Sequence, residues 1–150
     1  MQIESRPADD PGLARLLVAA VDELNVRYPE DPTDHTLDPR AEFLVAAVEG
    51  RAAGCAALVP LDRAAGEIKR VYVDPGFRGR GVASRLLDEL EDRARASAIA
   101  RLVLETGIRQ PESVALYEKR GYAPIEPFGP HLGSSLSLCY AKDLQPLPRP

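Results

Sequence analysis

An apolar strand, a glycine-bearing loop and the start of a helix follow one another between Val71 and Leu87. Gly79 and Gly81 allow the main chain to turn tightly and to approach a ligand without an intervening Cβ atom. The helix that is expected to begin near Val82 adds unpaired N–H groups and the positive end of its dipole. These residue types in this order predict a binding site for a phosphate or a pyrophosphate.

Arg78, Arg80 and Arg85 place positive charge around this loop. They suit a polyphosphate ligand, although a solvated helix start rich in arginine would have the same composition. The formal net charge of the whole chain is −4, which argues against a general nucleic-acid binder. We therefore interpret the basic cluster as a local ligand site and expect no nucleic-acid partner.

The pattern Arg78-x-x-Gly81-x-Ala83 resembles the acyl-CoA-binding motif of the GCN5-related N-acetyltransferases, the GNAT family. Residues 116–122 resemble the second signature of that family. Two ordered motifs at the family spacing are more specific than either alone. The resemblance implies that acetyl-CoA is the cosubstrate and that its acetyl group passes directly to a primary amine in a ternary complex. A non-catalytic acyl-CoA-binding module, acting as a sensor or an interaction partner on the same fold, stays open as the alternative.

The resemblance also implies the GNAT (acyl-CoA N-acyltransferase) fold, in which the fourth and fifth strands separate and the acyl-CoA arm lies in the gap between them. It implies roles for individual residues as well. The loop backbone would hold the diphosphate, the preceding strand would pair with the pantetheine, and the Val73 N–H would face the thioester oxygen. The chain departs from the family at Gln110, where an asparagine is common, and Pro111 follows it. The residues implied in cofactor binding are Val71, Val73, Arg78, Gly79, Arg80, Gly81, Val82, Ala83, Ser84, Gln110 and Tyr117.

Tyr117 and Glu67 are the candidate catalytic residues. Tyr117 matches the family tyrosine whose hydroxyl protonates the departing CoA thiolate, although an aromatic ring on a helix can simply pack in the core. Glu67 precedes Arg78 by the offset at which histone-acetylating members carry their general base. It could take the amine proton through a water, and an exposed carboxylate at a strand end is the alternative.

Glu105 and Glu126 lie near the ends of two strands, where carboxylates would suit a cationic amine, and we expect them to line the acceptor pocket. By analogy with the family, the loop 128–132 would border the same pocket. His35 and His131 lie in separate loops without an evident partner, so we predict no metal site. The resemblance implies that the acceptor is a small-molecule amine or a peptide amine, and a homodimer stays open because dimers are frequent in the family.

A dinucleotide-binding oxidoreductase is the main rival interpretation. Gly79-x-Gly81-x-x-Ser84 follows a strand and opens a helix, and Glu105 follows at about the distance of a ribose-binding acid. The third glycine is missing, however, and the remaining chain is too short for a second nucleotide-binding half. We therefore set this interpretation aside.

Length and composition suit one domain, because the chain has 150 residues, of which 45% are hydrophobic and 28% charged. We expect a single domain over residues 1–150, with its core in 2–144 and a frayed tail in 145–150. Cys55 and Cys139 lie in apolar runs and are expected to be buried thiols of a reducing compartment. No run has membrane-spanning length and no apolar signal region begins the chain, so we expect a cytoplasmic protein without a membrane partner.

Hydrophobic periodicity predicts an α/β fold with a mixed, mostly antiparallel central sheet of about six or seven strands and helices on both faces. The strand, helix and strand between residues 67 and 106 imply a parallel pair joined by a right-handed crossover. Residues 28–39 are expected to form a loop. Alternation along the strand 67–73 is expected to place Ile68, Arg70 and Tyr72 on one face and Glu67, Lys69, Val71 and Val73 on the other. The strands are expected at 2–6, 42–49, 52–61, 67–73, 102–106, 122–125 and 135–142, and the helices at 11–24, 82–98 and 111–121.

Overall fold

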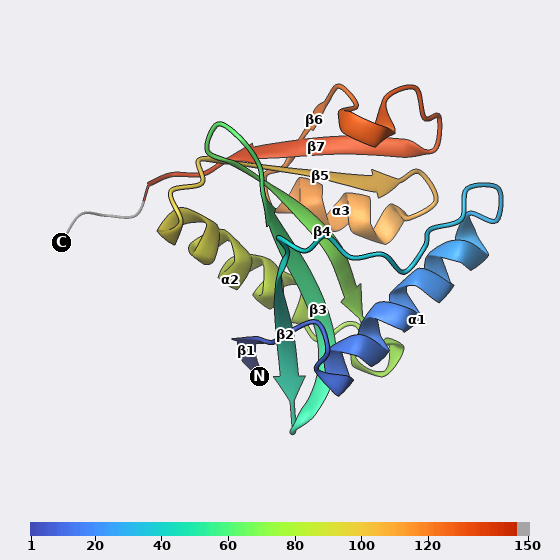
Figure 1. The fold of residues 1–150 in the computed structure, drawn as a ribbon, viewed down its shortest axis with the longest axis vertical. Helices are drawn as coiled ribbons and strands as arrows, with labels where there is room; N and C mark the ends of the chain where they lie inside the picture. Colours follow the sequence, from blue (N-terminus) through green and yellow to red (C-terminus); the bar gives the residue numbers. More distant parts are fainter. Residues whose placement is uncertain (147–150) are drawn as a thin grey trace.

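Seven strands form one sheet in the computed structural model, which describes residues 1–146 (Figure 1). Their spatial order is β1-β2-β3-β4-β5-β7-β6, and the neighbouring pairs are antiparallel except for β4 and β5. The predicted mixed, mostly antiparallel sheet is thereby confirmed. Residues 147–150, which belong to the predicted tail, lie outside the described residues. The strands are β1 (Gln2–Ser5), β2 (Glu42–Val48), β3 (Arg51–Pro60), β4 (Ala65–Val73), β5 (Arg101–Gly107), β6 (Ala123–Ile125) and β7 (Ser137–Asp143).

Three α-helices connect the strands within residues 1–146: α1 (Pro11–Arg27), α2 (Val82–Ala96) and α3 (Pro111–Lys119). Two short 3₁₀ turns, η1 (Pro75–Phe77) and η2 (Gly129–His131), lie in the loops. The α1 helix begins as its sequence predicts, because the Asp10 side chain accepts a hydrogen bond of 3.0 Å from the Leu13 N–H and Pro11 occupies the first turn. Among the described residues, none of these helices is long and apolar enough to cross a membrane.

The helices cover both faces of the sheet, as predicted. Along β2, Leu44 and Ala46 pack in a core cluster with α2, whereas Phe43 and Val45 pack in a second cluster with α1. Alternating side chains of a strand point to opposite faces, so each face of β2 meets a different helix. The α2 side is the larger core. Its fully buried leucines contribute roughly 2 kcal/mol each by hydrophobic burial; they are Leu86, Leu87 and Leu90.

The expected alternation along β4 is wrong because the strand contains a bulge. Arg70 has a φ of 56°, and the pairing of β3 with β4 shifts register at this point. An extra residue in one strand turns the side chains that follow it to the opposite face. Ile68 and Tyr72, which were expected to share a face, therefore lie on opposite faces. Val71 packs with Ile68 on the α2 side, whereas Tyr72 packs on the α1 side.

Candidate active site

Strands β4 and β5 pair along only part of their length. Their parallel pairing joins residues 65–68 to residues 101–104 and is not continued farther along either strand. Beyond this point β4 continues against β3 to Val73, and β5 continues against β7 to Gly107. The two strands therefore separate at their carboxyl ends, and a gap opens between them.

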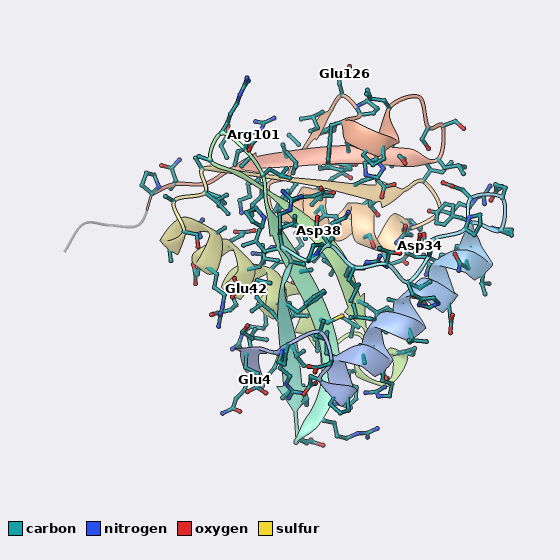
Figure 2. All side chains as sticks on the ribbon, in the orientation of Figure 1. Glu4, Asp34, Asp38, Glu42, Arg101 and Glu126 are labelled. Atoms are coloured by element: carbon teal, nitrogen blue, oxygen red, sulfur yellow. The ribbon has the colours of Figure 1, made fainter. Side chains whose placement is uncertain are left out.

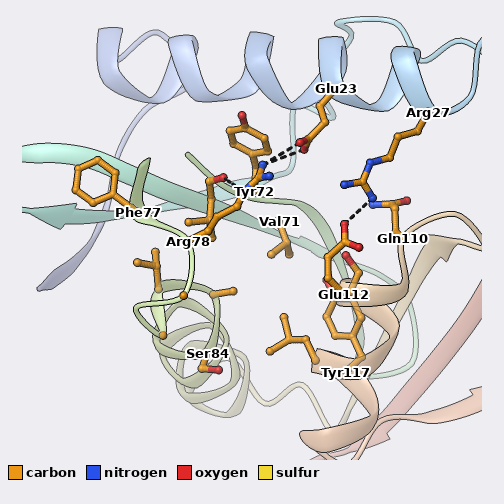
Figure 3. A pocket seen from close by; sticks show the side chains of 17 residues that line it. Glu23, Arg27, Val71, Tyr72, Phe77, Arg78, Ser84, Gln110, Glu112 and Tyr117 are labelled. Carbon is orange, nitrogen blue, oxygen red and sulfur yellow. Dashed lines mark hydrogen bonds and ion pairs between the residues drawn. The ribbon is translucent and has the colours of Figure 1, made fainter. Parts of the chain in front are cut away.

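A cavity of about 420 Å³ lies at this gap, and we call it the first cavity (Figure 3). Its walls come from α1, β4, the loop after β4, the start of α2, and α3. Arg80 is the one predicted cofactor residue that does not line it, because its side chain is exposed and stacks 5.4 Å from the ring centroid of Phe77. The predicted residues that do line it are Val71, Val73, Arg78, Gly79, Gly81, Val82, Ala83, Ser84, Gln110 and Tyr117.

The loop before α2 presents its backbone N–H groups to this cavity. Gly79 and Gly81 have φ values of 80° and 76°, in the left-handed region that favours glycine. A Cβ atom at either position would meet no atom of the protein within 4 Å. Among the described residues, the N–H groups of residues 79–84 have no hydrogen-bond acceptor. Together with the positive end of α2 they form a site suited to an anion.

The Arg78 side chain folds back and ties the loop to its surroundings (Figure 3). Its Nε donates a hydrogen bond of 2.9 Å to the Val73 carbonyl. Its terminal nitrogen donates to both Glu23 oxygens of α1, at 3.0 and 3.1 Å. The guanidinium also lies 5.5 Å from the ring centroid of Tyr72. Arg78 lines the first cavity, but the described structure pairs its positive charge with Glu23.

The last residue of β4 offers its own backbone to the gap. The Asp74 N–H donates a hydrogen bond of 2.8 Å to the Ala53 carbonyl of β3, and Val73 pairs with Gly54. Bonded and non-bonded residue pairs alternate along an antiparallel ladder. The N–H and C=O of Val73 therefore point away from β3, toward the space between β4 and β5. A donor at this position could bind a ligand that enters the gap.

Tyr117 of α3 lines the first cavity (Figure 3). Its side chain is only 5% exposed and packs edge-on against the Tyr122 ring, with 5.7 Å between centroids. Burial, together with the negative charge of Glu105, raises the pKa of the Tyr117 phenol well above its ordinary value. The hydroxyl therefore keeps its proton at neutral pH and is available as an acid.

A second cavity of about 280 Å³ adjoins the first one, and Tyr117 is among the residues that line both. It extends between β4, β5, α1 and the loops after α1 and β6, and His131 of the loop 128–132 forms part of its wall. Several side chains line both cavities and form the boundary between them. Two ligands, one in each cavity, would therefore meet at this boundary. The shared residues are Glu23, Val71, Tyr72, Gln110, Ser113 and Tyr117.

The second cavity brings together two of the three predicted carboxylates. The Glu67 side chain is only 14% exposed and lies 4.0 Å from the Lys69 ammonium. The Glu105 carboxylate accepts a hydrogen bond of 2.7 Å from the Ser137 hydroxyl. Glu126, by contrast, is exposed at the end of the sheet that carries β6 and lines neither cavity (Figure 2). Within residues 1–146, no group of three metal-ligating side chains comes together.

Gln110 lines both cavities, but its amide oxygen is engaged by the protein. It accepts hydrogen bonds from the Gly107 N–H at 3.0 Å and from the Tyr28 hydroxyl at 3.4 Å. The same hydroxyl accepts from the Arg109 N–H at 2.9 Å. This network fixes the turn between β5 and α3 and leaves the amide nitrogen of Gln110 to face a ligand.

The contribution of α1 to the site was missed by sequence reasoning. Glu23 and Arg27 lie one turn apart and reach across the first cavity, where Arg27 pairs with Glu112 of α3 (Figure 3). Their spacing shows that they share a helix face, but such charges usually belong to a solvated surface. Only the packing of α1 against β3 and β4 brings them to the first cavity.

Comparison with known proteins gives consistent matches over most of the chain. The model of the acetyltransferase (GNAT) family matches residues 12–122. An IAA acetyltransferase of Azospirillum brasilense is 41% identical over 124 residues, which cover 78% of this chain and 80% of that protein. A Klebsiella pneumoniae structure assigned to the acyl-CoA N-acyltransferases has a TM-score of 0.82 and 34% identity, covering 96% of this chain and 97% of that one. A GNAT acetyltransferase of Elizabethkingia anophelis, solved with acetyl-CoA bound, has the same fold, with a TM-score of 0.73, 22% identity, and coverage of 95% and 97%.

Proposed function

Because the chain belongs to the acetyltransferase (GNAT) family and is thus an N-acyltransferase, we propose that it transfers an acetyl group from acetyl-CoA to a primary amine by direct attack in a ternary complex. The observation that carries the proposal is the meeting of two cavities at Tyr117, one beside an anion-binding loop and one lined by carboxylates. Direct transfer requires both substrates to be bound at once with their reacting atoms in contact. Two adjoining cavities with a shared boundary suit this requirement.

The first cavity would hold the CoA moiety. The free N–H groups of residues 79–84 and the start of α2 are suited to the diphosphate. The Val73 N–H points into the gap, where it would donate to the thioester oxygen. A donor at this position stabilises the negative charge that develops on this oxygen during attack.

Glu67 and Tyr117 would then move the protons. Glu67 takes one proton from the ammonium, and the free amine attacks the thioester carbonyl carbon as the carbon–sulfur bond breaks. Tyr117 gives its hydroxyl proton to the departing thiolate. The second proton that leaves the nitrogen restores the Tyr117 phenol, so the products are the amide, CoA as a thiol and one proton. The high pKa of Tyr117 keeps it in the acid form that this role needs.

Tyr117→Phe tests the proposal, with Tyr140→Phe as its matched control. Both side chains are 5% exposed, and for neither hydroxyl does the described part of the chain supply a hydrogen-bond partner, but Tyr140 lines neither cavity. We expect Tyr117→Phe to lower kcat at least tenfold, which corresponds to about 1.4 kcal/mol, with an unchanged Kd for acetyl-CoA. Tyr140→Phe should keep the parent kcat. The measurements are CoA release across a panel of amines and calorimetric binding of acetyl-CoA.

The same assay separates the enzyme from a binding module. If the protein binds acetyl-CoA but none of the amines in the panel causes CoA release, the protein is a sensor on the same fold and the proposed transfer is rejected. Equal kcat values for Tyr117→Phe and the parent would show that another group protonates the thiolate. Glu67→Gln should lower kcat/KM most strongly at low pH, where the smallest fraction of the amine is already deprotonated.

A further inference from the structure

The second cavity contains charged groups of both signs. Glu23, Glu67 and Glu105 supply three carboxylates, whereas Lys69 and Arg70 supply two cations. A ligand that enters this space meets only those charges that the protein has not already matched internally. The pattern of internal ion pairs therefore indicates which charges a ligand must carry.

Two of the carboxylates have cationic partners within the protein. Both carboxylate oxygens of Glu23 accept hydrogen bonds from Arg78. Glu67 lies 4.0 Å from the Lys69 ammonium. Neither carboxylate needs a ligand charge to offset its own.

Glu105 and Arg70 are the charges that stay unmatched. Glu105 accepts from the Ser137 hydroxyl and lies 4.0 Å from the Nδ1 of His131, but no lysine or arginine among residues 1–146 comes within 4.0 Å of it. Arg70 donates to the Thr36 carbonyl at 2.8 Å, and within the same residues it has no carboxylate within 4.0 Å. One anion and one cation are thus left in one cavity.

The sheet places these two residues on opposite sides of the gap. Ile68 and Leu104 form the last pair of β4 with β5. Glu105 comes directly after Leu104 on one strand, and Arg70 comes two residues after Ile68 on the other, at the bulge. Glu105 and Tyr117 both line this cavity. The anionic side of the cavity is therefore the side next to the expected reaction centre.

We infer that the acceptor is a small amino acid or an amino-acid-like molecule, whose ammonium faces Glu105 and Glu67 and whose carboxylate binds Arg70. This inference rests on the proposed function and names its substrate class. A volume of about 280 Å³ is near the lower end for small-molecule pockets, which favours a compact acceptor. A polyamine would place a second ammonium against Arg70 and leave that guanidinium without an anion, and such a mismatch of charges disfavours it.

Matched acceptors that differ only in the carboxylate test the inference. The panel consists of several amino acids, each with its carboxamide and its decarboxylated amine, and the readout is kcat/KM from CoA release. We expect the parent protein to favour the amino acid over both analogues by about tenfold or more, because a charge-assisted pair with arginine is lost in the analogues. In Arg70→Gln this preference should fall to about one, and Arg70→Lys should restore part of it.

Arg40→Gln is the control, since Arg40 is an exposed arginine that pairs with Asp38 and lines neither cavity. It should keep the parent preference. The inference is overturned if carboxamides and plain amines have the same kcat/KM as the amino acids. That outcome leaves the proposed acetyl transfer intact. It is also overturned if Arg70→Gln keeps the full preference. Binding of acetyl-CoA without CoA release for any member of the panel would reject both the inference and the proposed function.

Discussion

Replacing Gly81 by valine tests whether the loop before α2 holds the CoA diphosphate. Gly81 has a φ of 76°, so a valine there is strained, at a cost of roughly 1–2 kcal/mol of stability. A Cβ atom would meet no protein atom within 4 Å, so no steric clash within the protein adds to this cost. The branched side chain would instead stand in the open space before the free N–H groups, where the diphosphate is proposed to bind.

Gly50 provides a matched control in the turn between β2 and β3. Its φ is 75°, and a Cβ atom there also meets nothing within 4 Å. Gly50→Val should therefore lose nearly the same stability as Gly81→Val. Because Gly50 lines neither cavity, the difference between the two variants isolates the effect on the ligand.

Denaturant unfolding and titration calorimetry with CoA give the two quantities. We expect both variants to lose a similar free energy of unfolding. Gly81→Val should also bind CoA at least tenfold more weakly, because losing even one hydrogen bond to a charged oxygen costs about 1.5–3 kcal/mol. If Gly81→Val binds CoA as tightly as Gly50→Val and the parent, the diphosphate does not lie on this loop and our reasoning is refuted.

Three further predictions concern stability and reactivity. Gly107→Ala should lower Tm by several degrees, because the added Cβ would overlap the Tyr28 hydroxyl, and a Tm equal to that of the parent would contradict this packing. Burial raises the pKa of the Cys55 thiol to about 12, so iodoacetamide at pH 8 should label it only after unfolding, as mass spectrometry can show. Hydrogen bonds from Arg109 lower the pKa of Glu30 from 4.5 to about 2; the associated stability is complete above pH 4.5 and is lost as the pH falls toward 2. Arg109→Gln should therefore lose less stability than the parent between pH 5 and pH 2 in urea unfolding, and identical pH dependences would refute this assignment.

Much of the fold follows from local patterns in the sequence. Asp10 and Pro11 mark the start of α1, and glycines with an arginine mark the turn into α2. The strand, helix and strand order predicts the parallel pair of β4 and β5, because a crossover helix is the usual connection between parallel strands. Such signals act over a few residues, so a single sequence is enough to detect them.

Other features depend on contacts that no local pattern encodes. Arg80 and Glu126 have suitable charges but point into solvent, because side-chain direction at a loop or an edge strand depends on the surrounding packing. No glycine or proline in the sequence indicates the bulge at residue 70, because an arginine takes the left-handed conformation there. One inserted residue then reverses the faces of the residues after it.

By itself, the sequence determined the glycine turn and the free N–H groups between Gly79 and Ser84, because glycine conformations and the start of a helix are properties of adjacent residues. It likewise determined that Tyr117 lies on the helix after β5. Only the tertiary structure decided at which residue β4 and β5 stop pairing, that α1 brings Glu23 to the gap, and that a second cavity adjoins the first. These features arise from packing between segments that are distant in the chain. A cavity between such segments cannot be predicted from the residues of any one of them.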